Sequence, residues 1–171
     1  MTRREHEITE RNRIIEILDK CKIVHLAFID EGKPYLLPMN YGDTMEDGRL
    51  TLYVHSATTG HKLDVIRTNP MVSFEMECDL EPFEGKVACQ YGLAYSTVFG
   101  MGTAEILEDP EEKGDALSNL MKVQTGKDFS FDEKMVSIVS VIKIRVTEYA
   151  AKHRAVPEGL QAQYSAQIKK V

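Results

Sequence analysis

One short segment gathers hydroxyl and basic side chains where a strand is expected to pass into a helix. The first N–H groups of a helix have no partner inside it, and the helix dipole favours negative charge there. Hydroxyl groups and a lysine at the same place predict a phosphate-sized anion site. The alternative is that a threonine caps the helix while Lys62 is solvated. The segment reads His55-Ser56-Ala57-Thr58-Thr59-Gly60-His61-Lys62.

A second segment, residues 36–41, has the composition of an edge strand. Pro38 lacks an N–H group, so this strand is expected at a sheet edge or a bulge. Its main-chain groups then remain available to one edge of a planar ligand, although a plain edge strand of the core has the same pattern. The segment reads Leu36-Leu37-Pro38-Met39-Asn40-Tyr41.

A third segment, residues 95–102, places Ser96 and Thr97 ahead of Gly100 and Gly102. The glycines permit close approach of a ligand or of another backbone. A curved barrel strand is the alternative. His25 and His55 lie in apolar strands, where histidine is usually a core or interface residue. Cys78 and Cys89 lack a second pair of ligands, so no metal centre is predicted.

The bulk composition limits the classes of function. The chain has 171 residues, a formal charge of −6 and three cysteines. Its length fits one domain, and its acidic charge argues against nucleic acid or an anionic membrane as a partner. The odd cysteine count indicates reduced thiols. With no apolar run long enough to cross a bilayer and a charged N-terminus, we expect a cytoplasmic protein.

The hydrophobic pattern predicts a mainly β fold, β+α in class, with about six mostly antiparallel strands forming a small barrel with short peripheral helices. The strand over 23–29 is apolar on both faces, so a helix, the barrel interior or a partner subunit should cover each face. Helices are expected over 10–20 (capped by Thr9), 61–67 and 111–123. Strands are expected over 23–29, 34–41 and 50–55 as a meander, then 71–78, 87–91, 97–107 and 135–146, with an acidic loop at 79–86.

The order of several stretches resembles a known family. They are HLAFIDEGKPYLLPMNYG, LYVHSATTGHKLDVIRTNP, VSFEMEC and YSTVFGMGTAEILEDPEEKGDALSNLM, preceded by a helix containing residues 11–18. Together they resemble the pyridoxamine 5′-phosphate oxidase-like FMN-binding split barrels, and among these the 5-nitroimidazole resistance (Nim-type) proteins. The resemblance covers residues 5–150.

This resemblance implies a homodimer that holds FMN, or FAD, at the subunit interface. Residues 1–150 would form the flavin-binding split-barrel domain, and 151–171 a C-terminal tail that belongs to the same domain or forms a dimer arm. By the resemblance, the cofactor-binding positions are Leu37, Pro38, Met39 and Asn40 beside the flavin ring, His55, Ser56 and Ala57 at a strand end, Gly60, His61 and Lys62 at the phosphate, and Ser96 and Thr97 on a later strand.

The resemblance also leaves the activity open. His61 stands where pyridoxamine phosphate oxidases usually carry arginine, and the chain has no tryptophan, which argues against vitamin B6 oxidation. The first hypothesis is a flavin-dependent reductase of a small electron-poor substrate such as a nitroaromatic, with His55 as the polar group beside the flavin. The alternatives are a non-catalytic flavin-binding or sensing protein, and a split barrel that binds haem or a deazaflavin.

Overall fold

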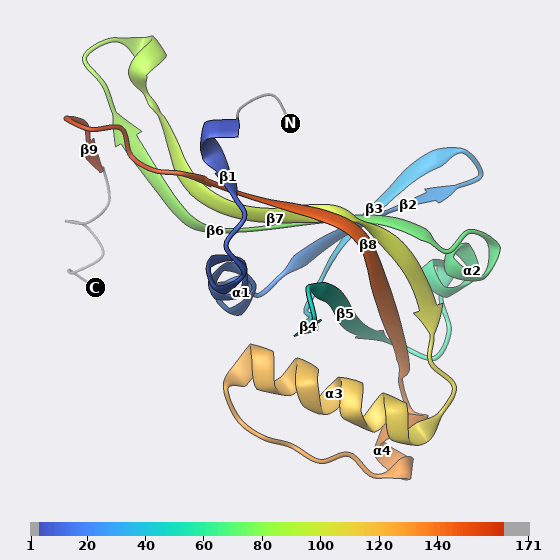
Figure 1. The fold of residues 1–171 in the computed structure, drawn as a ribbon. Helices are drawn as coiled ribbons and strands as arrows, with labels where there is room; N and C mark the ends of the chain where they lie inside the picture. The colour runs from blue at the N-terminus through green and yellow to red at the C-terminus, as the bar shows by residue number, and fades with distance from the viewer. Residues whose placement is uncertain (1–3, 163–171) are drawn as a thin grey trace, which may run out of the picture.

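The computed structural model describes residues 4–162, and a coiled antiparallel sheet dominates it (Figure 1). The strand order is β3-β2-β6-β7-β8-β5-β4, with short β1 and β9 pairing with β8 and β6. The predicted mainly β barrel with peripheral helices is confirmed. The strands are β1 Glu7–Ile8, β2 Val24–Asp30, β3 Lys33–Met39, β4 Gly42–Glu46, β5 Arg49–Ser56, β6 Met71–Glu84, β7 Gly92–Ile106, β8 Ser140–Arg154 and β9 Gln161–Ala162.

The first four long strands form two separate hairpins. β2 pairs with β3 and β4 pairs with β5, but β3 and β5 are not neighbours. The predicted three-strand meander is therefore wrong, because residues 40–41 redirect the chain and β4 is a strand of its own. The turns follow the expected chemistry, since Gly32 and Gly48 adopt positive φ angles of 80° and 78°, which glycine accepts without steric cost.

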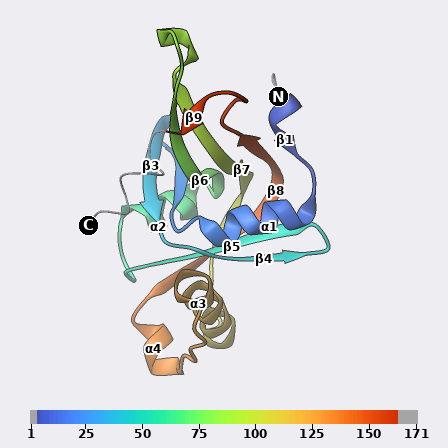
Figure 2. The same ribbon diagram turned by 90° about the vertical axis from the view of Figure 1, so that its left-hand side faces the viewer.

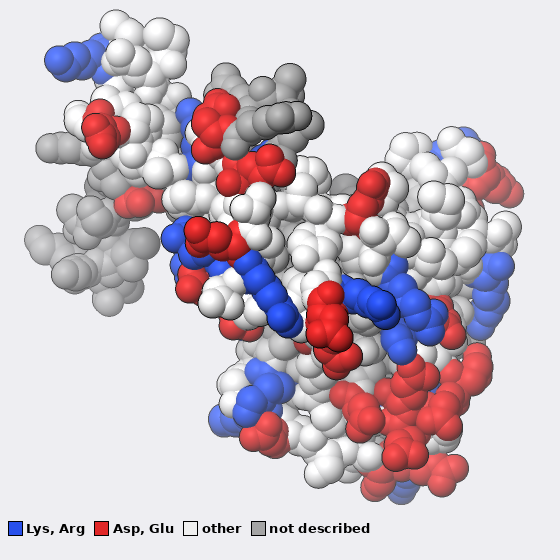
Figure 3. Space-filling model, in the orientation of Figure 1, with Lys and Arg blue, Asp and Glu red and all other residues white. Residues whose placement is uncertain are grey.

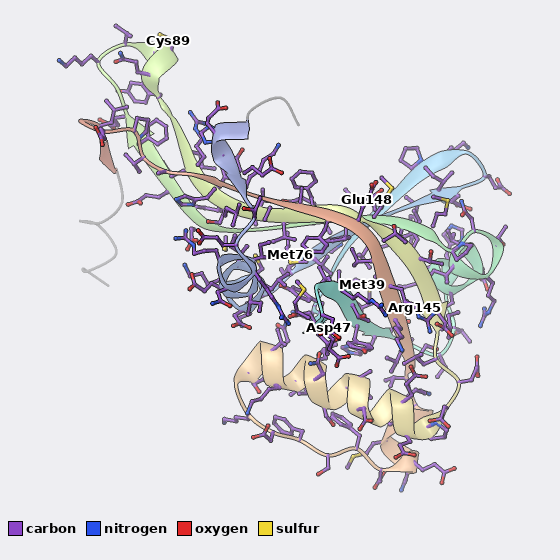
Figure 4. All side chains as sticks on the ribbon, in the orientation of Figure 1. Met39, Asp47, Met76, Cys89, Arg145 and Glu148 are labelled. Atoms are coloured by element: carbon purple, nitrogen blue, oxygen red, sulfur yellow. The ribbon has the colours of Figure 1, made fainter. Side chains whose placement is uncertain are left out.

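β6 and β7 form a long ribbon that extends beyond the barrel as an arm, with Cys89 at its tip (Figures 1 and 4). The predicted acidic loop at 79–86 is wrong, because β6 continues to Glu84 after a register shift between Cys78 and Glu81. The strand predicted at 87–91 is wrong too, since a short 3-10 helix, Ala88–Gln90, turns the chain there. The end of β6 was not recognised as a strand because its charged side chains interrupt the apolar pattern.

β8 holds the barrel together. It pairs with β7 along most of its length, with β5 through residues 140–145, and with β1 near its end. The strand predicted over 135–146 begins later than expected, because a short helix α4, Glu133–Ser137, precedes it. It also runs on to Arg154, past the predicted boundary at residue 150. The tail segment 163–171 lies outside the described residues.

Two helices close the ends of the barrel (Figure 2). α1, Arg11–Lys20, buries Ile14, Ile17 and Leu18, and α2, His61–Thr68, buries Leu63, Val65 and Ile66. Both join one core cluster with the inward-facing strand residues. Thr9 does not cap α1 as predicted: Glu10 occupies the N-cap position, and no side-chain hydrogen bond forms there.

A third helix covers only part of the outer barrel surface. α3, Pro110–Thr125, begins at Asp109, whose side chain accepts a hydrogen bond from the Glu112 N–H, and it ends at Gly126 with φ 72°. Acidic side chains gather over its N-terminal end (Figure 3), where the helix dipole favours them. α3 packs on β4, β5 and β8. Within residues 4–162 no helix has the length and apolarity that spanning a bilayer requires.

The rest of the outer surface, over β3, β2, β6 and β7, has no helix on it. Its large apolar side chains are exposed: Leu36 by 64%, Met71 by 62%, Ile29 by 47% and Met101 by 40%. We call this surface the open face. It is the second apolar face that the sequence pattern of residues 23–29 predicted, and within one chain the described residues leave it uncovered.

Candidate functional site

The N-terminus of α2 begins without a side-chain cap. Gly60 is the N-cap residue, with φ 141°, and no side chain accepts a hydrogen bond from the first turn. Thr58 and Thr59 are exposed. The alternative in which a threonine caps this helix is therefore wrong. The Leu63 N–H donates to the Gly60 carbonyl at 2.9 Å, whereas the His61 and Lys62 N–H groups and both hydroxyl groups remain available to an anion.

Lys62 stands in that first turn and is half-buried. Burial lowers its pKa, and no carboxylate contributes to the shift. Among residues 4–162 it forms no ion pair. A partly desolvated ammonium group without a counter-charge is stabilised by a bound anion. Lys62 is therefore the strongest single indication of an anion site at this position.

His61 is held by the neighbouring β2–β3 hairpin. Its Nε2 lies 2.8 Å from an Asp30 carboxylate oxygen, and its ring meets that of Tyr35 edge-on at 5.2 Å between centroids. These contacts fix the start of α2 against β3. Sequence reasoning missed Asp30 and Tyr35, because nothing local marks a residue that supports another from a different element.

β3 lies at the end of the sheet and pairs only with β2 among the described strands, as Pro38 predicted. Leu37 and Met39 pack against the core cluster, so only their backbone groups face the free edge, whereas Pro38 is exposed. The Asn40 side-chain amide donates to the Lys22 carbonyl and to Gln124 Oε1, each at 3.2 Å. Asn40 therefore ties β3 to the end of α3.

The end of β5 leads directly into the turn before α2. His55 is exposed and lies opposite Val141 of β8, and its ring makes no hydrogen bond within residues 4–162. Ser56 donates its hydroxyl to the Ala57 carbonyl at 2.9 Å. The structure thus brings the predicted residues of β5 and α2 to one end of the barrel, with α2 anchored on the β2–β3 hairpin. The predicted residues of β3 lie further along the sheet, since the last residue of β3 pairs with the first residue of β2, whereas α2 contacts the last residue of β2.

Ser96 and Thr97 lie on opposite faces of β7. Ser96 is buried, with its hydroxyl 2.9 Å from Asp79 Oδ2 and 3.0 Å from His153 Nδ1. Thr97 faces the open side, where its hydroxyl donates to Glu75 Oε1 at 2.9 Å or to the Met76 carbonyl at 2.8 Å. Of the two predicted residues, only Thr97 points toward the outer face of the sheet, and it is itself buried there, with 7% exposed.

Thr97 does not reach the anion site of its own chain. It pairs with Glu77 of β6, near the level where β2 begins, whereas His61 contacts Asp30, where β2 ends. β2 spans seven residues, and a strand rises about 3.3 Å per residue, so the two positions are separated by roughly 20 Å along the sheet.

The sequence profile described as pyridoxamine 5′-phosphate oxidase matches residues 10–153, which include every element from α1 to nearly the end of β8. The chain belongs to the pyridoxamine 5′-phosphate oxidase family. The family predicted from the sequence is confirmed. A solved structure described provisionally as a 5-nitroimidazole antibiotic resistance protein from Bacteroides thetaiotaomicron is 30% identical, covers 86% of each chain and superposes with a TM-score of 0.73, which also confirms the resemblance to that branch.

Further comparisons extend the fold assignment. A structure of an FAD and heme binding protein from Mycobacterium smegmatis has a TM-score of 0.76 at 15% identity, and the match covers 92% of this chain and 84% of that one. At this identity the likeness concerns the fold alone. General stress protein 26 of Bacillus subtilis is 32% identical over 73 residues, which are 43% of this chain and about half, 49%, of that protein.

Proposed function

We propose that this family member binds FMN at the end of the barrel where β3, β5 and α2 meet, and acts as a homodimeric flavin-dependent reductase of small electron-poor molecules such as nitroaromatics. The observation that carries the proposal is Lys62, half-buried and without an anionic partner at the start of an uncapped helix. The FMN phosphate supplies the missing charge, and the free edge of β3 supplies main-chain groups for the flavin ring.

When bound, the flavin supplies the redox chemistry, and the chain supplies binding, orientation and electrostatics. Lys62 and the α2 N-terminus hold the phosphate. His61, fixed by Asp30, keeps the phosphate turn against the β2–β3 hairpin. His55, near the end of β5, is exposed, and its ring makes no hydrogen bond among the described residues; we assign it to the flavin or its substrate. Support for a nitroaromatic substrate comes from the likeness to the Bacteroides thetaiotaomicron protein.

The dimer part of the proposal is supported by two features of the single chain. The open face exposes large apolar side chains, and contiguous patches of this kind mark interaction surfaces. Thr97 points toward the open face but lies far from its own Lys62, so on this proposal a partner subunit provides the flavin that it contacts. Each site then draws on both copies.

The phosphate contact is tested by comparing FMN with riboflavin, which lacks the phosphate. Lys62→Ala should weaken FMN binding by about 1.5–3 kcal/mol, which is about 10- to 150-fold, because a charge-assisted hydrogen bond is lost. Riboflavin affinity should hardly change. Fluorescence quenching of each flavin by the apoprotein measures both. Arg67→Ala is the control, since Arg67 pairs with Asp64 at the other end of α2.

Equal losses of affinity for FMN and riboflavin would show that Lys62 does not contact the phosphate. A protein that purifies without flavin absorption bands, and takes up no FMN when it is supplied in excess, would remove the whole proposal. The reductase part is tested separately: the FMN-loaded protein is reduced with dithionite without oxygen and mixed with a nitroimidazole. Return of the oxidised flavin spectrum supports the reductase activity. If the flavin stays reduced, the proposed function is limited to flavin binding or sensing.

A further inference from the structure

A cluster of three side chains lies on the open face, away from the start of α2. His25 on β2 pairs directly with Glu75 on β6, and Glu77 is two positions further along β6 on the same face. The potential ligand atoms of the three side chains all lie within 4.8 Å of one another. Because the sheet fixes the backbone beneath them, the cluster is held in place before any ligand arrives.

The distances in the cluster match those between the ligands of one metal ion. His25 Nδ1 is 3.4 Å from Glu75 Oε2 and 3.8 Å from Glu77 Oε2. An ion with bonds of about 2.1 Å to nitrogen and oxygen in tetrahedral geometry keeps its ligand atoms about 3.4 Å apart. In the single chain all three side chains are partly exposed, by 35–44%, so an ion can reach them before a second copy covers this face.

The charge of the cluster is not balanced by fixed cations. No lysine or arginine among residues 4–162 forms an ion pair with Glu75 or Glu77. A bound cation supplies the positive charge that the two carboxylates lack.

Thr97 supplies the support that metal ligands usually have. Its hydroxyl lies 2.9 Å from Glu75 Oε1, which orients the carboxylate and leaves Oε2 facing His25. Such outer contacts fix ligand geometry in metalloproteins. The donor set of one imidazole nitrogen and two carboxylate oxygens suits a divalent first-row transition metal better than Mg²⁺ or Ca²⁺, which prefer oxygen alone.

We propose that His25, Glu75 and Glu77 form a binding site for a divalent transition metal of the Zn²⁺ class, with Thr97 as a positioning residue. The site shares Thr97 with the proposed flavin contact, but its three ligands are not flavin-site residues, so the metal and the flavin proposals can fail separately. Sequence reasoning missed it, since two glutamates and a histidine separated by 50 residues carry no recognisable spacing. Only the pairing of β2 with β6 brings them together.

Isothermal titration of the chelator-treated full-length protein with Zn²⁺ tests the site. We expect one ion per chain, with Mg²⁺ in excess unable to displace it. His25→Gln and Glu77→Gln should each weaken Zn²⁺ binding by at least about 10-fold, and Thr97→Val by about 10-fold, as is typical for outer-shell changes. Glu81→Gln, on the same strand but outside the cluster, is the matched control and should bind Zn²⁺ as the parent does.

Thermal unfolding of each variant without metal identifies any that fail to fold, and the two conservative glutamine variants provide independent measurements. Absence of stoichiometric Zn²⁺ binding would overturn the proposal. So would binding that persists in both glutamine variants but disappears in Cys89→Ser, because the exposed thiol at the tip of the arm would then be the ligand. In either case the flavin measurements are unaffected.

Discussion

Two halves of the same barrel surface carry similar apolar side chains, but helices cover only one of them. Over β4, β5 and the start of β8, α3 and α4 bury a small cluster that includes Leu117, Val136 and Val141. Over β3, β2, β6 and β7, nothing within residues 4–162 lies on the open face, and Leu36 and Met71 are its most exposed apolar side chains.

The difference shows that local composition does not determine whether an apolar barrel face is covered by other elements of the same chain. The open face even contains a shallow apolar cavity of about 550 Å³, where Gly100 lets the backbone of Glu148 come so close that a Cβ atom would clash with it. A face with large apolar side chains and a hollow is shaped for another surface. On our proposal that surface is a second copy of the chain.

The largest effect is expected in the covered half. Leu120 is buried where α3 packs on the barrel, so Leu120→Ala should lower the free energy of unfolding by about 2–4 kcal/mol through lost burial and a residual cavity. Urea unfolding at a fixed protein concentration measures it. Leu36→Ala on the open face is the comparison and should cost less when the protein is dilute. Equal costs at every concentration would contradict the distinction between the halves.

A smaller effect is expected from a charge on the open face. Met71→Asp should weaken self-association by at least about 10-fold, or roughly 1.4 kcal/mol, because a carboxylate would be buried without a partner. Sedimentation velocity over a range of concentrations measures it. Ile138→Asp, at an exposed position next to α4, is the control and should leave association unchanged. A parent protein that is monomeric throughout would refute the dimer.

The smallest effect concerns the strand beneath α3. Burial raises the pKa of Asp43 from 3.8 to about 6, its Oδ1 has no hydrogen-bond partner among the described residues, and its backbone oxygen accepts from Asn119 of α3. The folded state binds the proton of the Asp43 carboxyl group more tightly than the unfolded state does. The contribution of this protonation to the free energy of unfolding is therefore complete below pH 3.8 and is lost as the pH rises through 6.

Asp43→Asn cannot lose a proton, so at pH 7 it should be more stable than the parent by about 1 kcal/mol, and at pH 4 nearly equal to it. Urea midpoints at the two pH values decide the matter. A variant that is less stable at pH 7 would mean that the Asp43 carboxylate makes a stabilising contact. The Asp43 Oδ1 atom in the covered half would then have an interaction partner in solution.

The sequence predicted the elements whose residues interact locally. α2 and α3 were foreseen from Asn69-Pro70, Pro110 and apolar spacing, and β3 was foreseen at an edge from Pro38. The continuation of β6 into the arm was missed, because the acidic residues of the segment 79–86 break the apolar alternation that marks a strand. The meander was wrongly predicted, because strand order depends on contacts between residues far apart in the chain, such as Thr51 with Arg145.

The candidate site divides in the same way. Lys62 and Gly60 were predicted correctly as part of the helix start, because the residues that form an anion site there are consecutive in the sequence. Ser96 was included with Thr97, but the alternation of β7 turns its hydroxyl inward to Asp79 and His153. Asp30, Tyr35 and the His25 cluster carry no local signal, because each acquires its place only when two hairpins meet.

The threefold pairing of β8 has a consequence for how the chain folds. β8 is the partner of β1, β5 and β7, so β4 and β5 stay separate from the rest of the sheet until residues 140–154 have been synthesised. Pairings across such long sequence distances slow folding, since the entropy of closing the loops must be met before the contacts form. During translation β5, which ends at residue 56, therefore stays unpaired on that side until the ribosome reaches residues 140–145.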